Sequence, residues 1–152
     1  MKKIKEQIKV ILVDDDCDDR LIFEDAIQQV LENCEVITFS DGSEITNYLR
    51  DNENRNNLPD IVFMDINMPK VNGIEALKII RHELRIDDLT IAMYSTSTVN
   101  RDIEAAFIGG ANIYVNKPSS MPLLVKSLYK LFIMKIHHNK SDLDQDTFMF
   151  TI

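Results

Sequence analysis

Three aspartates, a serine and a lysine are the residues of this 152-residue sequence that best suit phosphate chemistry. Asp14 and Asp15 follow the apolar run VILV, and Asp65 ends the run DIVFMD. Ser95 ends the run LTIAMYS, and Lys117 comes shortly after NIYV. Carboxylates held close together raise one another's pKa unless a cation keeps them ionised, and oxygen ligands favour a hard ion such as Mg²⁺. With a hydroxyl and an ammonium beside them, they predict phosphoryl transfer in which a carboxylate is the nucleophile.

The segments that must position these residues alternate between strand-like and helix-like patterns. Short apolar runs rich in β-branched residues predict strands over 10–13, 35–39, 60–65, 89–95 and 112–115. Apolar residues at helical spacing predict helices over 20–33, 43–50, from 73 to about 84, from 99 to the glycine pair at 109–110, and from 124 to about 136. The alternation indicates a (βα)5 doubly wound α/β fold with helices on both faces of a five-stranded parallel sheet.

The order of the strands decides whether the reactive residues meet. In an open parallel sheet, ligands bind beyond the carboxyl ends of the strands, where the strand order reverses. In the common order 2-1-3-4-5, the first and third strands are neighbours at this point. Asp14, Asp15 and Asp65 would then converge on one pocket, which makes a merely solvated strand end the weaker interpretation of the acidic run.

Other polar residues near these strand ends have structural explanations. Asp16, Asp18 and Asp19 are expected to cap the first helix and to place negative charge at its N-terminus. In the run STST, Thr96 and Thr98 are expected to cap the helix that follows, whereas Ser95 keeps the functional interpretation. The alternatives left open are a plain surface lysine at 117 and simple packing for the aromatic residue at 114.

The cysteines and histidines carry no pattern of a disulfide or metal site. Cys17 and Cys34 form no CxxC pair, so both are expected to be reduced, and the aspartates around Cys17 should raise its pKa and reduce its reactivity. His82 and the pair His137–His138 lack metal-ligand spacing and are expected to be solvated.

The overall charge excludes several classes of partner. The chain has 25 acidic and 17 basic residues, a net charge of −8 and a pI of about 4.8, which disfavours binding to nucleic acid or anionic lipid. No apolar run has the length of a secretory h-region or a membrane-spanning helix. These features predict a soluble, cytoplasmic protein that does not bind DNA directly or associate with a membrane.

Four segments together are similar to the signature segments of the response-regulator receiver domain of two-component systems. ILVDDD, FMDINMPKVNG, MYSTS and YVNKP occur in that order and with matching spacing, and the resemblance spans residues 8–136. It implies a flavodoxin-like fold and a phospho-acceptor at Asp65. It also implies that Mg²⁺ binds Asp15, Asp65 and the backbone carbonyl of Asn67 directly, and Asp14 through water.

The same resemblance assigns roles to the later segments. Ser95 takes the position of the switch hydroxyl, Lys117 that of the phosphate-binding lysine, and Tyr114 that of the aromatic residue that swings inward on activation. The Lys117–Pro118 bond is expected to be cis, which proline permits at low cost. Asn67 and Ser97 lie where the family tunes the lifetime of the phosphoryl group.

The remaining sequence suggests how such a protein would signal. Residues 137–152 are expected to form a tail without an output domain, which is disordered or docks its FMF segment on the domain or on a partner. The expected partners are a sensor histidine kinase or phosphotransfer protein and a downstream protein target, with a homodimer as a further possibility. The loop RDNENRNNLPD resembles that of single-domain regulators that serve hybrid or phytochrome-type sensor kinases.

Two other functions share some of these sequence features. An aspartate-nucleophile phosphatase of the haloacid-dehalogenase type would also use Mg²⁺, an Asp and a Lys, but it requires a DxDx[TV] pattern, and here Asp14 and Asp15 are adjacent. A binding module that works without phosphorylation is the second alternative. The sequence also lacks a Walker GxxxxGK[ST] loop for ATP.

Overall fold

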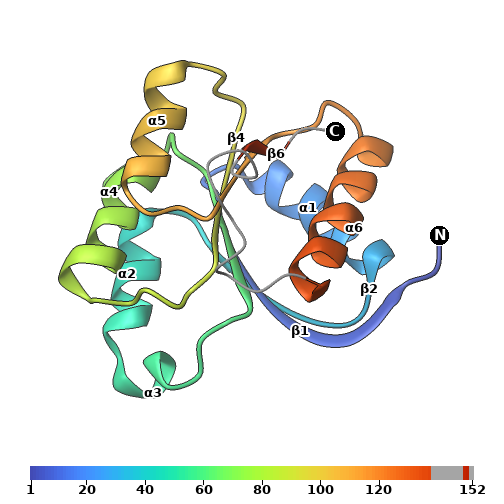
Figure 1. Ribbon diagram of the computed structural model, residues 1–152, viewed down its shortest axis with the longest axis horizontal. Helices are drawn as coiled ribbons and strands as arrows, with labels where there is room; N and C mark the ends of the chain where they lie inside the picture. Colours follow the sequence, from blue (N-terminus) through green and yellow to red (C-terminus); the bar gives the residue numbers. More distant parts are fainter. Residues whose placement is uncertain (138–148, 151–152) are drawn as a thin grey trace.

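A parallel sheet forms the centre of the computed structural model, which describes residues 1–137 and 149–150 (Figure 1). Its strands are β1 (Ile4–Val13), β2 (Leu31–Phe39), β3 (Ile61–Met64), β4 (Ile91–Ser95) and β5 (Ile113–Asn116). They pair in the order β2-β1-β3-β4-β5, which confirms the predicted order 2-1-3-4-5 and the flavodoxin-like fold. A sixth strand, the two-residue β6 (Met149–Phe150), extends the sheet by pairing in parallel with β5.

Helices cover both faces of the sheet, as the alternation predicted. Figure 1 shows α1 (Cys17–Val30) and α6 (Met121–His137) together on one side, and α2 (Gly42–Arg50), α4 (Gly73–Lys78) and α5 (Asn100–Ile108) on the other. A one-turn helix, α3 (Asn52–Arg55), follows α2, and α4 continues into the π-helical turn η1 (Ile79–Glu83). The described residues contain no helix that is long and apolar enough to cross a membrane.

Alternate residues of each central strand point into two separate cores. Val10 and Leu12 of β1 pack on the side of α1 and α6, whereas Ile11 and Val13 pack on the side of α2 and α4. All four are completely buried. A strand that is covered on both faces must be apolar at every position, which explains the unbroken apolar runs in the sequence. The two cores hold the carboxyl ends of β1 and β3 rigidly beside each other.

Several element boundaries differ from the sequence prediction. α1 begins at Cys17 rather than at residue 20, because Asp16 caps it, and β2 begins at Leu31, where the helical pattern was expected to continue. β1 begins at Ile4 rather than at residue 10, and Ile4 pairs with Leu31. Pairing between distant segments therefore overrides the local helical pattern at the end of α1. The polar segment after α2, predicted to be a loop, forms α3 with Asp51 as its N-cap.

The tail prediction is partly answered by the structure. Met149 and Phe150 of the FMF segment add β6 to the edge of the sheet, so the backbone at this point docks on the domain. The prediction of a disordered tail concerns residues 138–148 and 151–152, which lie outside the described residues. The glycine pair ends α5 as predicted, since Gly110 adopts a positive φ of 96° that favours glycine.

Gly73 allows α4 to begin directly against the end of β3. A Cβ atom at residue 73 would lie 2.1 Å from the carbonyl oxygen of Asp65, which is far closer than two such atoms can approach. The Gly73 N–H also donates to the carbonyl of Ile66 at 2.9 Å. This close contact fixes the backbone of Asp65 from the side of α4.

The Gly73→Ala variant should be destabilised by about 2 kcal/mol, as for other forced overpacking of backbone. In an unconstrained helix the same change would stabilise the protein by up to about 1 kcal/mol, so the sign of the effect is diagnostic. Urea unfolding monitored by circular dichroism measures it. Lys78→Ala, at an exposed position of the same helix, serves as a control that should change little. A stability of Gly73→Ala equal to or above that of the wild type would contradict the contact.

Candidate functional site

Three carboxylates meet beyond the ends of β1 and β3. Asp14 and Asp15 follow β1 and Asp65 follows β3, and one carboxylate oxygen of each lies within 4.8 Å of the others. The register aligns Val13 with Met64, and the Asp65 N–H donates to the carbonyl of Val13 at 2.9 Å. Asp14 is completely buried, Asp65 is 8% exposed and Asp15 is exposed. The strand order thus brings together the three residues that the sequence indicated.

Lys117 lies at the centre of this acidic group. Its Nζ donates to Oδ2 of Asp14 at 2.7 Å, to Oδ2 of Asp19 at 3.0 Å and to Oδ2 of Asp65 at 3.1 Å. The ammonium also lies 5.3 Å from the centre of the Tyr94 ring, close enough for a cation–π contact. Lys117 is therefore a partly buried member of the site that binds three carboxylates, and the alternative of a plain surface lysine is wrong.

The predicted cis bond before Pro118 is wrong, because the peptide bond between Lys117 and Pro118 is trans. The trans isomer is favoured by about 0.5–1 kcal/mol even before proline, and only local geometry can reverse this preference. Here the Lys117 side chain reaches all three of its carboxylate partners from a trans bond. The position of the ammonium therefore does not require the cis isomer.

The single ammonium does not balance the negative charge around it. Burial alone lowers the pKa of Lys117, but its hydrogen bonds to Asp14 and Asp19 and the charge of Asp65 outweigh this and raise the pKa above its ordinary range. Burial raises the pKa of Asp14, and the bonds from Lys117 and from the Asp16 N–H do not fully compensate. Lys117 therefore stays charged while it is shared among several acids, and the site retains a deficit of positive charge.

Backbone amides orient the two buried carboxylates. Oδ1 of Asp14 accepts from the N–H of Asp16 at 3.0 Å, and Oδ1 of Asp65 accepts from the N–H of Ile66 at 2.7 Å. In both residues this leaves Oδ2 directed at Lys117. Each carboxylate thus has one oxygen bound by a backbone N–H and the other bound by the Lys117 ammonium.

The acidic residues after Asp15 divide as predicted, with one addition. Asp16 is the N-cap of α1 and accepts from the N–H groups of Asp18 and Asp19, which lie in the first turn. Asp19 also forms the ion pair with Lys117, a contact that the sequence did not reveal. Its position in the first turn of a helix that starts at the site is the sequence signal that could have indicated it. Asp19 thus competes with Asp65 for the same ammonium.

Ser95, Ser97 and Tyr114 form a second connected group at the ends of β4 and β5. Ser95 is completely buried, and its Oγ accepts from the N–H of Ser97 at 3.2 Å. The Tyr114 hydroxyl donates to the carbonyl of Ser97 at 2.8 Å, and burial raises the pKa of this phenol. Tyr114 is completely buried and belongs to the core on the side of α4. The Tyr114 ring therefore points inward. It packs in the core and at the same time bonds to the residues after β4, so simple packing is only part of its role.

The predicted capping by Thr96 and Thr98 is wrong. The N-cap of α5 is Val99, without a side-chain hydrogen bond, and both threonines are exposed. Ser97 takes the local role instead, since its Oγ donates to Asp102 in the first turn of α5 at 2.6 Å and accepts from the N–H of Val99. The hydroxyl that bonds to the start of α5 therefore belongs to Ser97, which lies between the two threonines that the sequence indicated.

The remaining candidate residues are placed simply. Asn67 is exposed in the loop between β3 and α4, with its carbonyl in the segment that follows Asp65. His82 is exposed, as expected, and Cys17 and Cys34 are free thiols. Burial and the charges of Glu35 and Asp60 raise the pKa of Cys34 to about 11, which makes it unreactive. The side chain of His137 and all of His138 lie outside the described residues.

The donor set of the site fits a hard cation. Among the described residues, Asp14, Asp15 and Asp65 are the only group of at least three acidic, histidine or cysteine side chains arranged to hold a metal. All of their ligand atoms are oxygens, the type that Mg²⁺ prefers. The exposed Asp15 leaves this pocket open to solvent, so an ion there would keep some of its water.

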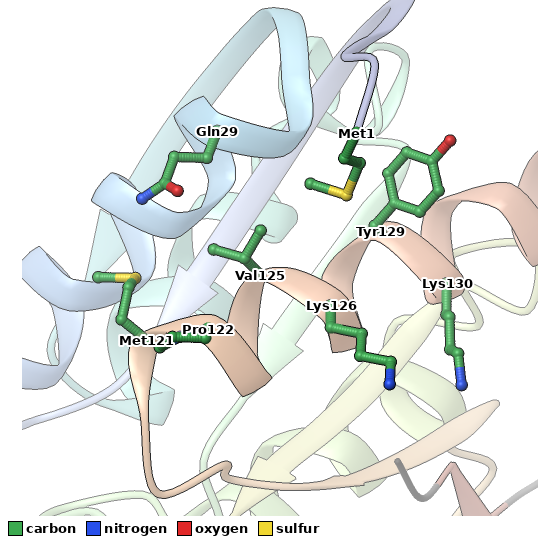
Figure 2. A pocket seen from close by; sticks show the side chains of 8 residues that line it. All are labelled: Met1, Gln29, Met121, Pro122, Val125, Lys126, Tyr129 and Lys130. Atoms are coloured by element: carbon green, nitrogen blue, oxygen red, sulfur yellow. The ribbon is translucent and has the colours of Figure 1, made fainter.

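A separate pocket of about 580 Å³ lies between α1 and α6 (Figure 2). Met1, Gln29, Val125 and Tyr129 line it together with two lysines, Met121 and Pro122, and no acidic residue faces it. It contains none of the carboxylates or hydroxyls described above. The chemistry of the acidic site therefore does not extend into it.

Comparison with known proteins gives consistent matches over most of the chain. The family model "Response regulator receiver domain" matches residues 10–129. A chemotaxis protein CheY homolog of Campylobacter jejuni is 29% identical over 121 residues, which cover 80% of this chain and 89% of that protein.

Solved structures agree with the sequence comparison. The phosphorylated cyanobacterial phytochrome response regulator RcpA superposes with a TM-score of 0.76 at 27% identity, and the match covers 87% of this chain and 96% of that chain. CheY in the CheX–CheY–BeF3–Mg²⁺ complex from Borrelia burgdorferi gives a TM-score of 0.68 at 25% identity, covering 82% and 89%.

The raised pKa of Asp14 predicts how stability changes with pH in the absence of divalent metal. As pH rises through the ordinary value of 3.8, the unfolded chain releases this proton before the folded protein does, so the free energy of unfolding falls and stays lower above the raised pKa. Asp14→Asn removes this loss. Relative to wild type, we expect the free energy of unfolding of the variant to rise as pH increases from below 3.8 to neutral, measured by urea unfolding in EDTA.

Asp18→Asn provides the matched control, because it removes an acid of the same type from an exposed position in the first turn of α1. Its unfolding free energy should follow the wild-type pH dependence. If the free energy of unfolding has the same pH dependence in Asp14→Asn and Asp18→Asn, then burial does not raise the pKa of Asp14 as expected.

Proposed function

The chain belongs to the response regulator receiver family, and on that premise we propose that Asp65 accepts a phosphoryl group from a sensor histidine kinase or a phosphotransfer protein. The observation that carries this proposal is the position of the Asp65 Oδ2 atom. It lies 3.1 Å from the Lys117 ammonium, beside two further carboxylates that suit Mg²⁺. The Ile66 N–H fixes Oδ1 of Asp65, and Asp65 keeps an exposed fraction of 8% whereas Asp14 is completely buried, which makes Asp65 the better acceptor of the two.

Mg²⁺ is the proposed cofactor, held by Asp15, Asp65 and the backbone carbonyl of Asn67, with Asp14 acting through water. Bound there, the ion would neutralise negative charge on the phosphoryl oxygens and orient the group for attack. The shortage of positive charge around Lys117 supports this assignment, because the protein alone leaves the site electrostatically unbalanced. The oxygens of Asp15 and Asp65 lie within 4.8 Å of each other and of the Asp14 oxygen, which suits two direct ligands and one that acts through water.

In the transfer, Oδ2 of Asp65 forms the new bond to phosphorus while the bond to the donor imidazole breaks. Lys117 then binds a phosphoryl oxygen in place of the Asp65 carboxylate, for which its ammonium is already in position. The Ser95 hydroxyl moves to donate to another of these oxygens. The chain thereby promotes its own phosphorylation, and its loss of the phosphoryl group to water, with Asn67 and Ser97 as the neighbours that set the lifetime.

The signal would leave the site through β4 and β5. Ser95 accepts a hydrogen bond from the Ser97 N–H, and the Tyr114 hydroxyl donates to the Ser97 carbonyl, so movement of Ser95 would disturb the buried position of Tyr114. We expect the surface formed by α5, β5 and α6 to change and to bind a downstream protein or a second copy of the chain.

Residues 8–136 make up the receiver domain in this proposal, and the exchange takes place in the cytoplasm. The RcpA structure is that of a cyanobacterial phytochrome response regulator. By this likeness, a sensor kinase of the phytochrome or hybrid type is the proposed source of the phosphoryl group.

Incubation with Mg²⁺ and acetyl phosphate should give one phosphoryl adduct by intact-protein mass spectrometry. Asp65→Asn should remove at least about nine tenths of it, since the nucleophile is lost. Asp18→Asn, in the first turn of α1, should be phosphorylated like the wild type. An adduct that persists in Asp65→Asn would place the phosphoryl group elsewhere.

Mg²⁺ should also stabilise the folded protein without any phosphodonor. An ion that binds only the folded state adds about 2.7 kcal/mol at a concentration near one hundred times its Kd. Asp15→Asn should lose most of this increase in the free energy of unfolding, whereas Asp18→Asn, which has the same change in charge, should keep it. Equal responses of the two variants to Mg²⁺ in urea unfolding would show that Asp15 is not a ligand.

A further inference from the structure

The tail strand β6 lies on the outer edge of β5, at the end of the sheet (Figure 1). Its two residues pair in parallel with β5, Met149 with Tyr114 and Val115 with Phe150. Without β6, the edge of β5 would present unpaired N–H and C=O groups, which readily accept another strand. Residues 149–150 therefore occupy a surface that is chemically suited to binding extended peptide.

This edge belongs to a strand that is connected with the acidic site through the residues after β4. The Tyr114 hydroxyl donates to the carbonyl of Ser97, and the N–H of Lys117 donates to the carbonyl of Ser95 at 2.8 Å. The two residues that pair with β6 are Tyr114 itself and Val115, two positions before Lys117. The segment of β5 that holds β6 is thus tied at both ends to the backbone of residues 95–97.

We propose that the edge of β5 is a strand-docking surface that residues 149–150 of the same chain cover until Asp65 is phosphorylated. Phosphorylation moves Ser95, shifts the partners of Tyr114 and Lys117, and weakens the pairing of β6 with β5. The exposed edge then binds an extended segment of the downstream protein by strand addition. The inference rests on the proposed function for its trigger, although the docking of the tail stands on the pairing alone.

The length of the chain favours its own tail as the occupant. Residues 138–148 join the end of α6 to β6, and at about 3.3–3.6 Å per extended residue they can span roughly 36 Å. α6 has 17 residues and is about 25 Å long, so this connection can return from its far end to the edge of β5. A short tether also gives an effective concentration in the millimolar range, which a free second copy does not reach.

The short pairing makes the tail a replaceable occupant. β6 pairs through only two residues, and so small a strand is marginal when it is not tethered. A partner that offers a longer strand can therefore displace it once phosphorylation has weakened the contact. By linkage, if phosphorylation weakens the pairing of β6 with β5, then loss of this pairing favours phosphorylation by the same free energy.

Two double variants of the full chain separate backbone pairing from side-chain effects. Met149→Pro with Phe150→Pro removes the amide donors of β6, because proline has no N–H. Met149→Val with Phe150→Val loses the same side chains but keeps these donors in residues that favour strands. Amide hydrogen exchange of residues 113–116 is measured by NMR for each protein in Mg²⁺, with and without acetyl phosphate. Mass spectrometry reports the phosphoryl adduct in every sample.

Without phosphodonor, the outward-facing amides of β5 should exchange at least about tenfold faster in the proline variant than in wild type, and the valine variant should resemble wild type. With the adduct present, exchange in wild type should rise toward that of the proline variant. A labelled peptide of residues 141–152, SDLDQDTFMFTI, serves as the probe for an extended segment. It should bind the proline variant and phosphorylated wild type, but not unphosphorylated wild type.

Equal exchange in the proline variant and unphosphorylated wild type would overturn the docking of the tail. A protected edge in wild type that carries the adduct would overturn its release, and a proline variant that ignores the peptide would overturn the docking surface. Protection that disappears on dilution would assign the occupant to a second copy. If no adduct forms at all, the proposed function is wrong, and so is the release of the tail by phosphorylation. The samples without phosphodonor still decide whether the tail docks on β5.

Discussion

The sharing of one ammonium among three carboxylates is the interaction on which the rest of this site depends. Lys117 comes from the end of β5, Asp14 and Asp65 from the ends of β1 and β3, and Asp19 from α1. Ion pairs of this kind are costly to bury, and they persist only where the surrounding structure fixes their geometry. The ammonium therefore joins three separate parts of the chain, and any group that takes over one of its partners changes all of them.

The scaffold supplies the rigidity that this arrangement needs. Val13 and Met64 pair in completely buried strands, which sets the spacing of the acids that follow them. Backbone N–H groups hold one oxygen of Asp14 and one of Asp65. The close approach of Gly73 to the Asp65 carbonyl fixes the backbone of Asp65 as well. The reactive oxygens are thus positioned before any metal or phosphoryl group arrives, so little ordering is left for the reaction itself.

The receiver-domain family model covers residues 10–129 of this chain, and the described tail strand β6, which lies beyond that match, covers one edge of the sheet. β5 carries Tyr114 on its buried side, leads directly to Lys117 and pairs with β6 along its outer side. A strand with these three contacts links the charge of the site to the accessibility of the backbone. The chemistry and the proposed binding surface are then two properties of the same four-residue element.

The amino-acid sequence by itself determined the alternation of strands and helices and indicated a parallel sheet, and with the common strand order it predicted the meeting of Asp14, Asp15 and Asp65. The strands follow from local patterns, because a strand covered on both faces must be apolar throughout and its polar residues can only stand at its end. The N-cap role of Asp16 is similarly local. Only the tertiary structure decided where α1 gives way to β2, because pairing of Leu31 with β1 outweighs the helical pattern there. It likewise decided that Asp19 reaches Lys117, that Ser97 rather than a threonine serves α5, and that Met149 and Phe150 pair with β5. Each of these depends on which distant backbones come together, and spacing along the chain carries no record of that.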